Sequence, residues 1–280
     1  MKSHNIDVEP SSPNLLLQIL ELRAVSEALA GLASWLLLKK CPRGDGRPVL
    51  VLPGLLAGDG STLAIRTHLE SLGYVVEGWG LGRNFGPRPG IEESMLEKLE
   101  SMAAANGQKV SLVGQSLGGV YARLLAQDRP DLVRCVMTLG SPVAGHPRAS
   151  NAWKIYEYFS GSRSDDHEKW AKVISAPTIP TSSICSRTDG VVDWSSTKCR
   201  PSKWAENIEV VSSHIGMGAH PAVLYAIADR LAQNPEKWEK FERSGWRKAM
   251  FPVAEADFFG YGELLQENKN DKLEELNSSK

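Results

Sequence analysis

The chain has 280 residues, of which 42% are hydrophobic and 23% are charged, and its formal net charge is −1. This length suffices for one large α/β domain with a substantial core, and the composition is that of an ordinary soluble globular protein. Because the charges balance and no long basic run occurs, the sequence argues against a nucleic-acid-binding protein.

Residues 1–46 are predicted to form a helical segment ahead of the main domain. Residues 1–13 are polar with mixed charge, and they lack the apolar run and small-residue cleavage site of a signal peptide. The leucine-rich stretch that follows is interrupted by Glu21, Arg23 and Glu27. Each charge would cost about 2.5–3.5 kcal/mol at the centre of a bilayer. We therefore expect a helix docked on the protein surface rather than a membrane anchor.

The apolar residues of this stretch do not follow one helical face. Positions at helical spacing include Leu16 and Leu20 but also Arg23 and Glu27, so no continuously apolar face is expected. Two lysines follow the apolar residues 35–38, which leaves peripheral attachment to a membrane as the alternative.

The main domain, predicted over residues 47–234, alternates between strand-like apolar runs and helical patterns. The predicted strands cover Pro48–Leu52, Tyr74–Glu77, Lys109–Val113, Arg134–Leu139, Thr178–Cys185 and Asn207–Val211. The predicted helices cover Ser61–Ser71, Ile91–Ala105, Leu117–Gln127 and Pro221–Gln233. This alternation predicts an α/β fold with a mostly parallel central sheet of about six strands and helices on both faces. Ligands of such sheets bind beyond the carboxyl ends of the strands.

The third strand-like run leads directly into Gly114-Gln-Ser-Leu-Gly-Gly119, and a helix is predicted to follow. A strand, a G-x-S-x-G pentapeptide and a helix in this order are typical of a nucleophile elbow. The glycines permit a tight turn that exposes the Ser116 hydroxyl at the N-terminus of the helix, where the free N–H groups favour negative charge. We favour this catalytic interpretation over a glycine-rich turn without chemistry.

Residues 142–177 are too many for a simple crossover between two strands. We interpret them as a helical cap over the active site, in which Trp153, Tyr156 and Phe159 line an apolar substrate pocket. The alternative is an ordinary helical excursion whose aromatic side chains pack on the sheet.

Residues 235–280 are predicted to form a C-terminal extension. Its aromatic residues, among them Phe241, Trp246 and Phe251, are expected to dock on the domain or on a partner subunit, which would make a homo-oligomer. The charged end, residues 266–280, is expected to be disordered.

The four cysteines show no C-x-x-C spacing. Cys135 and Cys185 lie in apolar strand-like runs, where a buried free thiol is the usual state. This favours a reducing, cytoplasmic compartment, with a Cys185–Cys199 disulfide as the alternative.

A serine hydroxyl is a weak nucleophile until a base removes its proton, so Ser116 requires a histidine and an orienting carboxylate. His214 follows the last predicted strand and is favoured as the base over His220, which precedes Pro221 at the start of a helix. Asp189 stands in the loop after the fifth predicted strand, beside a glycine that permits a sharp turn. It is favoured as the acid over Asp193 in the same loop.

Two backbone N–H groups are predicted to stabilise the oxyanion. One belongs to Leu117, directly after the serine, and the other to Leu55, in the loop after the first strand. Leu56 and Val191, in the loops around these groups, are predicted to contact the substrate.

In these motifs the chain resembles the α/β-hydrolase superfamily, in particular its bacterial lipases and esterases. The stretches that carry the resemblance are Pro48–Leu55, Trp79–Gly86, Gly114–Gly119, Thr138–Pro142, Ser186–Asp193 and Ser213–Met217. They span residues 47 to 232 in the order expected of the family, and they imply Ser116 as nucleophile, Asp189 as acid and His214 as base. Pro53 stands where many lipases have a histidine, which argues against close kinship to the secreted lipases.

The sequence thus predicts a serine esterase or lipase that hydrolyses acyl esters with an apolar chain through an acyl-enzyme on Ser116. No cofactor or metal is implied, because no ligand spacing occurs. Two alternatives are an acyltransferase or thioesterase with the same triad, and a binding protein with an inactive hydrolase fold.

Overall fold

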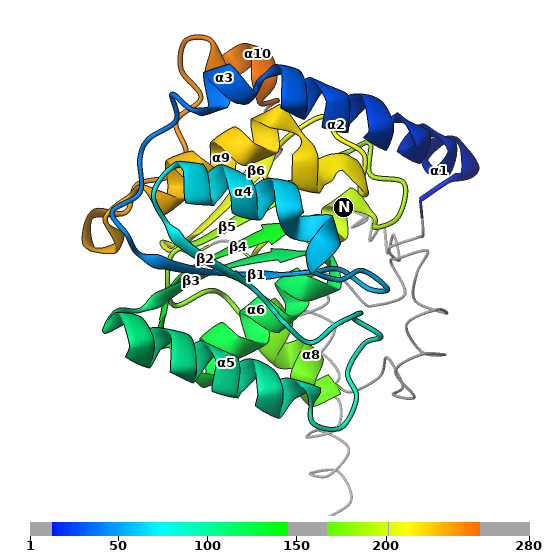
Figure 1. The fold of residues 1–280 in the computed structure, drawn as a ribbon. Coiled ribbons are helices and arrows are strands. Elements are labelled where there is room, and N and C mark those ends of the chain that lie inside the picture. The colour runs from blue at the N-terminus through cyan, green and yellow to red at the C-terminus, as the bar shows by residue number, and fades with distance from the viewer. Residues whose placement is uncertain (1–12, 145–166, 201, 253–280) are drawn as a thin grey trace, which may run out of the picture.

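The computed structural model describes residues 13–144, 167–200 and 202–252 (Figure 1). Six strands form one sheet in the order β2-β1-β3-β4-β5-β6, and every neighbouring pair is parallel. The strands are β1 (Pro48–Leu52), β2 (Val75–Gly78), β3 (Val110–Gln115), β4 (Val133–Leu139), β5 (Thr181–Cys185) and β6 (Ala205–Glu209). The predicted parallel α/β fold is confirmed.

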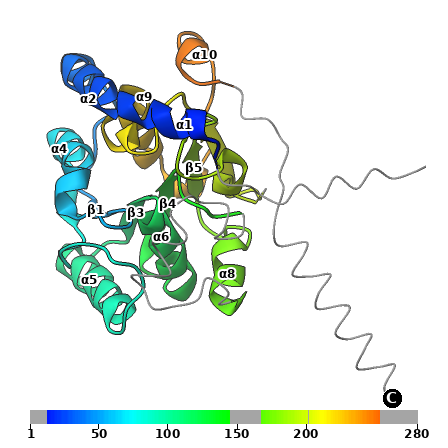
Figure 2. The same ribbon diagram turned by 90° about the vertical axis from the view of Figure 1, so that its right-hand side faces the viewer.

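Helices cover both faces of the sheet (Figure 2). The helices of the main domain are α4 (Leu63–Ser71), α5 (Ile91–Asn106), α6 (Leu117–Asp128), α8 (His167–Ile174) and α9 (Pro221–Leu231). Short 3-10 turns add η2 (Asp59–Thr62), η4 (Trp194–Thr197), η5 (Gly216–Ala219) and η6 (Pro235–Lys237). Along β1, Val49 and Val51 face the core under α4 and α9, whereas Leu50 and Leu52 face the core under α5 and α6. This alternation is the period of a strand that is buried on both faces.

The predicted ends of these elements differ from the observed ends by up to three residues. β5 begins at Thr181 rather than at residue 178. The preceding Pro180 has no N–H group to donate to a strand ladder, although its carbonyl accepts the N–H of Val136. The predicted helix at residues 61–71 starts instead with the 3-10 turn η2 and becomes α-helical at Leu63.

The N-terminal segment packs outside α4 and α9 as a further layer (Figures 1 and 2). It consists of α1 (Leu15–Leu20), the 3-10 turn η1 (Glu21–Arg23), α2 (Ala24–Ala33) and α3 (Trp35–Leu38). Within the described residues, no helix has both the length and the apolar character required to cross a membrane.

The expectation that this segment has no continuously apolar face was wrong. Glu21 and Glu27 are buried and Arg23 is half-buried, so all three charges of the segment point toward the protein body. The turn η1 interrupts the α-helical phase at Glu21, and the charged side chains find partners in the main domain. Most leucines of the segment are therefore left on the outer side, whereas Leu38 is buried in the core and Leu17 is half-buried.

The part of the C-terminal extension that is described packs on the domain. Phe251 is fully buried, its ring lies 4.8 Å from that of Phe241, and Trp246 contacts Tyr225 of α9 at 4.8 Å. The short helix α10 (Arg247–Met250) connects these aromatic residues. Residues 253–280 lie outside the described residues. So does most of the predicted cap, with Trp153, Tyr156 and Phe159.

Candidate active site

Ser116 lies in the turn between β3 and α6, at the carboxyl edge of the sheet. Its backbone adopts φ 52° and ψ −121°, an unfavourable conformation for a residue with a side chain. A Cβ atom at Gly118 would collide with the carbonyl oxygen of Leu52, and one at Gly114 would collide with that of Gly118. Only glycine at both positions allows α6 to start this close to the strands, and this geometry holds the serine in its strained turn.

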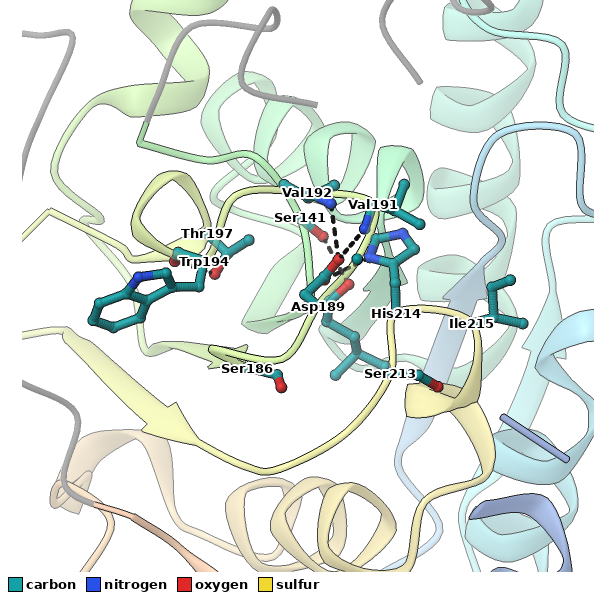
Figure 3. A network of polar contacts seen from close by, with 12 residues as sticks. Ser141, Ser186, Asp189, Val191, Val192, Trp194, Thr197, Ser213, His214 and Ile215 are labelled. Carbon is teal, nitrogen blue, oxygen red and sulfur yellow. Dashed lines mark hydrogen bonds and ion pairs between the residues drawn. The ribbon is translucent and has the colours of Figure 1, made fainter. Parts of the chain in front are cut away.

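The side chains of His214 and Asp189 meet in the loops that follow β6 and β5. The Nδ1 atom of His214 lies 2.7 Å from Oδ2 of Asp189 (Figure 3). The other carboxylate oxygen, Oδ1, accepts the N–H groups of Val191 and Val192, each at 2.8 Å. Asp189 is therefore fixed by its own loop and orients the imidazole, so that Nε2 faces away from the carboxylate.

The two competing residues serve as helix caps. Asp193 accepts the N–H of Ser195 at 2.9 Å at the start of η4. His220 accepts the N–H of Ala222 through Nδ1 at 3.2 Å at the start of α9. These contacts of Asp193 and His220 involve neither His214 nor Asp189.

His214 is 7% exposed, and its surroundings change the basicity of the imidazole. Burial alone lowers the pKa of His214, but the charge and hydrogen bond of Asp189 and the charge of Glu21 outweigh this effect. The pKa of His214 therefore lies above its usual value of 6.5. A raised pKa makes the neutral ring a stronger base.

The loop that carries His214 is joined to the turn that carries Ser116 through Gln115, the residue before Ser116. Its Nε2 donates to the carbonyl oxygen of His214 at 3.1 Å. Within the described part of the chain, no hydrogen bond joins the Ser116 hydroxyl to the imidazole. In enzymes without bound substrate such contacts are often long and tighten when the substrate binds.

The loop after β1 lies directly against the serine. A Cβ atom at Gly54 would be 3.2 Å from Cβ of Ser116 and 3.9 Å from its Oγ. Among the described residues, no acceptor is bonded to the backbone N–H of Leu55 or of Leu117. Their predicted role in stabilising negative charge on a bound substrate stays a prediction.

Asn84, which sequence analysis did not single out, holds this loop. It is fully buried, its Nδ2 donates to the carbonyl oxygen of Pro53 at 2.9 Å, and its backbone carbonyl accepts the N–H of Leu56 at 2.6 Å. Leu56 has φ 61°, which is strained for leucine. Asn84 lies in the stretch Trp79–Gly86, which carries part of the family resemblance, but its partner Pro53 lies 31 residues earlier in the chain. The sequence therefore did not indicate this contact.

Two further missed residues are the buried carboxylates of the N-terminal segment. Glu21 accepts the backbone N–H groups of Gly190, His214 and Ile215 at 2.7, 2.9 and 2.9 Å. One carboxylate thus holds the loops that carry Asp189 and His214 together.

Glu27 acts on the residue before His214. It accepts the backbone N–H of Ser213 at 2.8 Å and the hydroxyl of the same serine at 2.6 Å, and it is paired with Arg23 at 3.0 Å. Arg23 in turn donates to the carbonyl oxygen of Thr188 at 2.9 Å, beside Asp189. The available signal was the occurrence of three charges inside a leucine-rich stretch.

The predicted substrate contacts are only partly placed. Leu56 and Val191 are half-buried in the loops beside Ser116 and Asp189. Their role in binding substrate stays a prediction, as does that of the aromatic residues outside the described part of the chain.

Hydrolases are among the known proteins whose sequences are similar to this chain. The chain is 34% identical over 119 residues to the proposed carbamate hydrolase RutD of Klebsiella pneumoniae strain 342, across 40% of this chain and 44% of that protein. It is 32% identical over 107 residues to a triacylglycerol lipase of Pseudarthrobacter phenanthrenivorans, across 35% of this chain and 34% of that protein. The matches thus span less than half of the length of these curated relatives.

The structure resembles lipase B of Aspergillus fumigatus with a TM-score of 0.53 at 14% identity, covering 70% of this chain and 56% of that chain, which indicates a shared fold. The sequence also matches the family described as alpha/beta hydrolase fold over residues 91–262, more than half of the chain. With the six-stranded parallel sheet and the loops at its carboxyl edge, these matches show that the chain belongs to the alpha/beta hydrolase fold family.

Proposed function

We propose that this hydrolase cleaves carboxylic esters through an acyl-enzyme formed on Ser116. The observation that carries the proposal is the 2.7 Å contact between His214 and Asp189, on loops that adjoin the strained turn of Ser116. A buried imidazole oriented by a carboxylate can remove the proton of a serine hydroxyl, which an isolated serine cannot lose at neutral pH.

In the acylation step, Nε2 of neutral His214 takes the proton of Ser116 as Oγ attacks the ester carbonyl carbon. The carbonyl oxygen becomes negative and is stabilised by the N–H groups of Leu55 and Leu117. The imidazolium, stabilised by Asp189, then protonates the leaving alcohol as the ester C–O bond breaks. The products are free alcohol and acylated Ser116.

In the deacylation step, His214 removes a proton from water, whose oxygen attacks the acyl carbon. Collapse of the second tetrahedral intermediate breaks the bond to Oγ of Ser116 and returns the proton from His214 to the serine. The products are the carboxylic acid and the free enzyme, and one molecule of water is consumed for each ester cleaved. For the substrate, we propose acyl esters with an apolar chain, in keeping with the similarity to a triacylglycerol lipase.

A fluorophosphonate probe and a chain-length series of p-nitrophenyl esters test this function. Wild-type protein is expected to form a covalent adduct and to hydrolyse the esters. Ser116→Ala should form no adduct and lose turnover by more than about a thousandfold, with little change in stability. Ser61→Ala, which removes an exposed hydroxyl on η2, is the matched control and should behave as wild type.

Two outcomes would contradict the proposal. Labelling or turnover that survives in Ser116→Ala would place the nucleophile elsewhere. No adduct on folded wild-type protein would favour a binding protein with an inactive hydrolase fold. Added alcohol or thiol acceptors that divert the acyl group from water would instead identify an acyltransferase.

A further inference from the structure

The outer face of the N-terminal segment α1–α3 is unusually apolar for a protein surface. Ten large aliphatic side chains between residues 15 and 37 are at least 36% exposed, and the most exposed are Leu22 at 80%, Leu36 at 74% and Leu32 at 72%. No charged residue between 14 and 38 is exposed, since Glu21, Arg23 and Glu27 all point toward the protein body. Gln18 and Ser26 are the only polar residues exposed between residues 15 and 37. So large a group of exposed aliphatic side chains marks an interaction surface.

The chemistry of this face fits lipid better than protein. Protein interfaces are enriched in aromatic residues, methionine and arginine, and their energetic centres are depleted in leucine and valine. The exposed face of α1–α3 is aliphatic and lies on the outermost layer of the molecule (Figures 1 and 2). It therefore has the composition of a surface that enters acyl chains.

Basic residues stand at one end of the apolar face. Lys39, Lys40 and Arg43 are exposed directly after α3, and Nζ of Lys39 lies 5.9 Å from the ring of half-buried Trp35. Aliphatic side chains on one face, a tryptophan and a cluster of cations are typical of helices that lie in the plane of an anionic membrane surface.

From these observations we propose that α1–α3 bind the protein peripherally to the surface of an anionic lipid membrane. The aliphatic face enters the boundary between headgroups and acyl chains, while Lys39, Lys40 and Arg43 contact the anionic headgroups. Attachment is reversible, because the segment lies on the membrane and does not cross it.

The same segment places the candidate active site beside the membrane. The side chain of Glu21 accepts the N–H of Ile215, and Ile215, which follows His214, is 64% exposed. The backbone of Leu17 in α1 packs directly on Gly190, the neighbour of Asp189. A membrane-bound molecule would thus hold the loops of His214 and Asp189 next to the lipid, from which an apolar ester could enter.

Sedimentation of the full chain with vesicles tests the attachment independently of the proposed function. Vesicles of ether-linked phosphatidylcholine, with and without ether-linked phosphatidylglycerol, cannot be consumed by an esterase. We expect wild-type protein to sediment with vesicles that contain phosphatidylglycerol and to bind pure phosphatidylcholine less strongly. Lys39→Gln combined with Lys40→Gln should weaken binding to the anionic vesicles by about tenfold or more and leave binding to neutral vesicles nearly unchanged.

A pair of identical substitutions tests the apolar face itself. Val25 on α2 is 70% exposed, and Val75 at the start of the edge strand β2 is 42% exposed. Val25→Glu should weaken vesicle binding by at least about tenfold, because it places a carboxylate in the lipid boundary. Val75→Glu should bind as wild type, and circular dichroism checks that both variants are folded.

Three results would overturn the proposal. Wild-type protein that stays in the supernatant with both kinds of vesicle would exclude lipid binding. Equal binding by Val25→Glu and wild type would place the contact on another surface. Light scattering that gives a dimer for wild type and a monomer for Val25→Glu would show that a second copy of the chain covers this face.

Discussion

Replacing Glu21 by glutamine would test whether the N-terminal segment takes part in catalysis. The carboxylate accepts three backbone N–H groups, from Gly190, His214 and Ile215. Glutamine can keep the two bonds made by Oε1, but its NH₂ group then faces the N–H of Ile215. Loss of the acceptor of a fully buried donor costs about 1–3 kcal/mol, and the part-buried N–H of Ile215 lies at the low end of that range. Neutral hydrogen bonds are also about 1 kcal/mol weaker than charged ones. Since removal of a buried charge offsets part of this, we expect a loss of about 2 kcal/mol in the free energy of unfolding.

The pH dependence of activity separates a positioning role from a merely structural one. His214 must be neutral to accept the proton of Ser116, so kcat/KM falls as the pH falls through the pKa of His214. That pKa lies above 6.5, since Asp189 and Glu21 outweigh the effect of burial. Without the charge at position 21 the pKa of His214 falls. The acid limb of the pH–rate profile should therefore move to lower pH in Glu21→Gln, and kcat should decrease.

Urea unfolding and pH–rate profiles on a p-nitrophenyl ester provide the two measurements. Glu100→Gln, which neutralises a partly exposed carboxylate paired with Arg129 on the surface, is the matched control and should change neither. A Glu21→Gln variant that is destabilised but keeps the wild-type pH profile would show a purely structural role. A variant that changes in neither measurement would refute the reasoning altogether.

Further substitutions test other parts of the structure. Asp189→Ala should lower kcat by about ten-thousandfold. Asp193→Ala should keep most activity and, because Asp193 caps η4, lose only about 0.5–2 kcal/mol in the free energy of unfolding. If steady-state kinetics show the larger loss for Asp193→Ala, Asp193 rather than Asp189 is the acid. Gly31→Ala should lower both the melting temperature and kcat, because the added Cβ would collide with the carbonyl oxygen of Ala219 and displace α2. If neither value changes, α2 is not held against Ala219. Burial lowers the pKa of His68 from 6.5 to about 4, so as the pH falls the imidazole binds a proton in the unfolded chain before it does so in the folded protein. The contribution of neutral His68 to the free energy of unfolding is therefore complete above about pH 6.5 and is lost as the pH falls toward 4. His68→Leu should remove about 2 kcal/mol of the stability lost between about pH 7 and pH 5, and an unaltered loss in urea titrations would assign it to other groups.

Local patterns were sufficient to predict the sheet and the position of the candidate serine. Strands buried on both faces must be continuous apolar runs, and a helix must start with glycines to approach a strand closely, so both leave clear marks in neighbouring residues. The loop positions of Asp189 and His214 were also predicted, because loops at the carboxyl ends of parallel strands gather at one edge. Their roles in catalysis remain proposals.

Contacts between distant parts of the chain could not be predicted in the same way. The bond from Glu21 to the N–H of His214 joins residues 193 positions apart, and that to Gly190 joins residues 169 positions apart. Helical spacing places Glu27 and Leu20 on defined faces of an isolated helix, but it does not say which face the protein body will cover. The interruption at η1 changed that assignment.

The sequence alone determined the class of fold, the order of its strands along the chain and the turn that carries Ser116, because these depend on residues close to one another. The tertiary structure decided which carboxylate meets His214, which side chains hold the loops around Ser116 and which side of the N-terminal helices is left exposed. These features arise where segments far apart in the chain pack together, and packing selects partners by shape, charge and hydrogen bonding that no single segment contains.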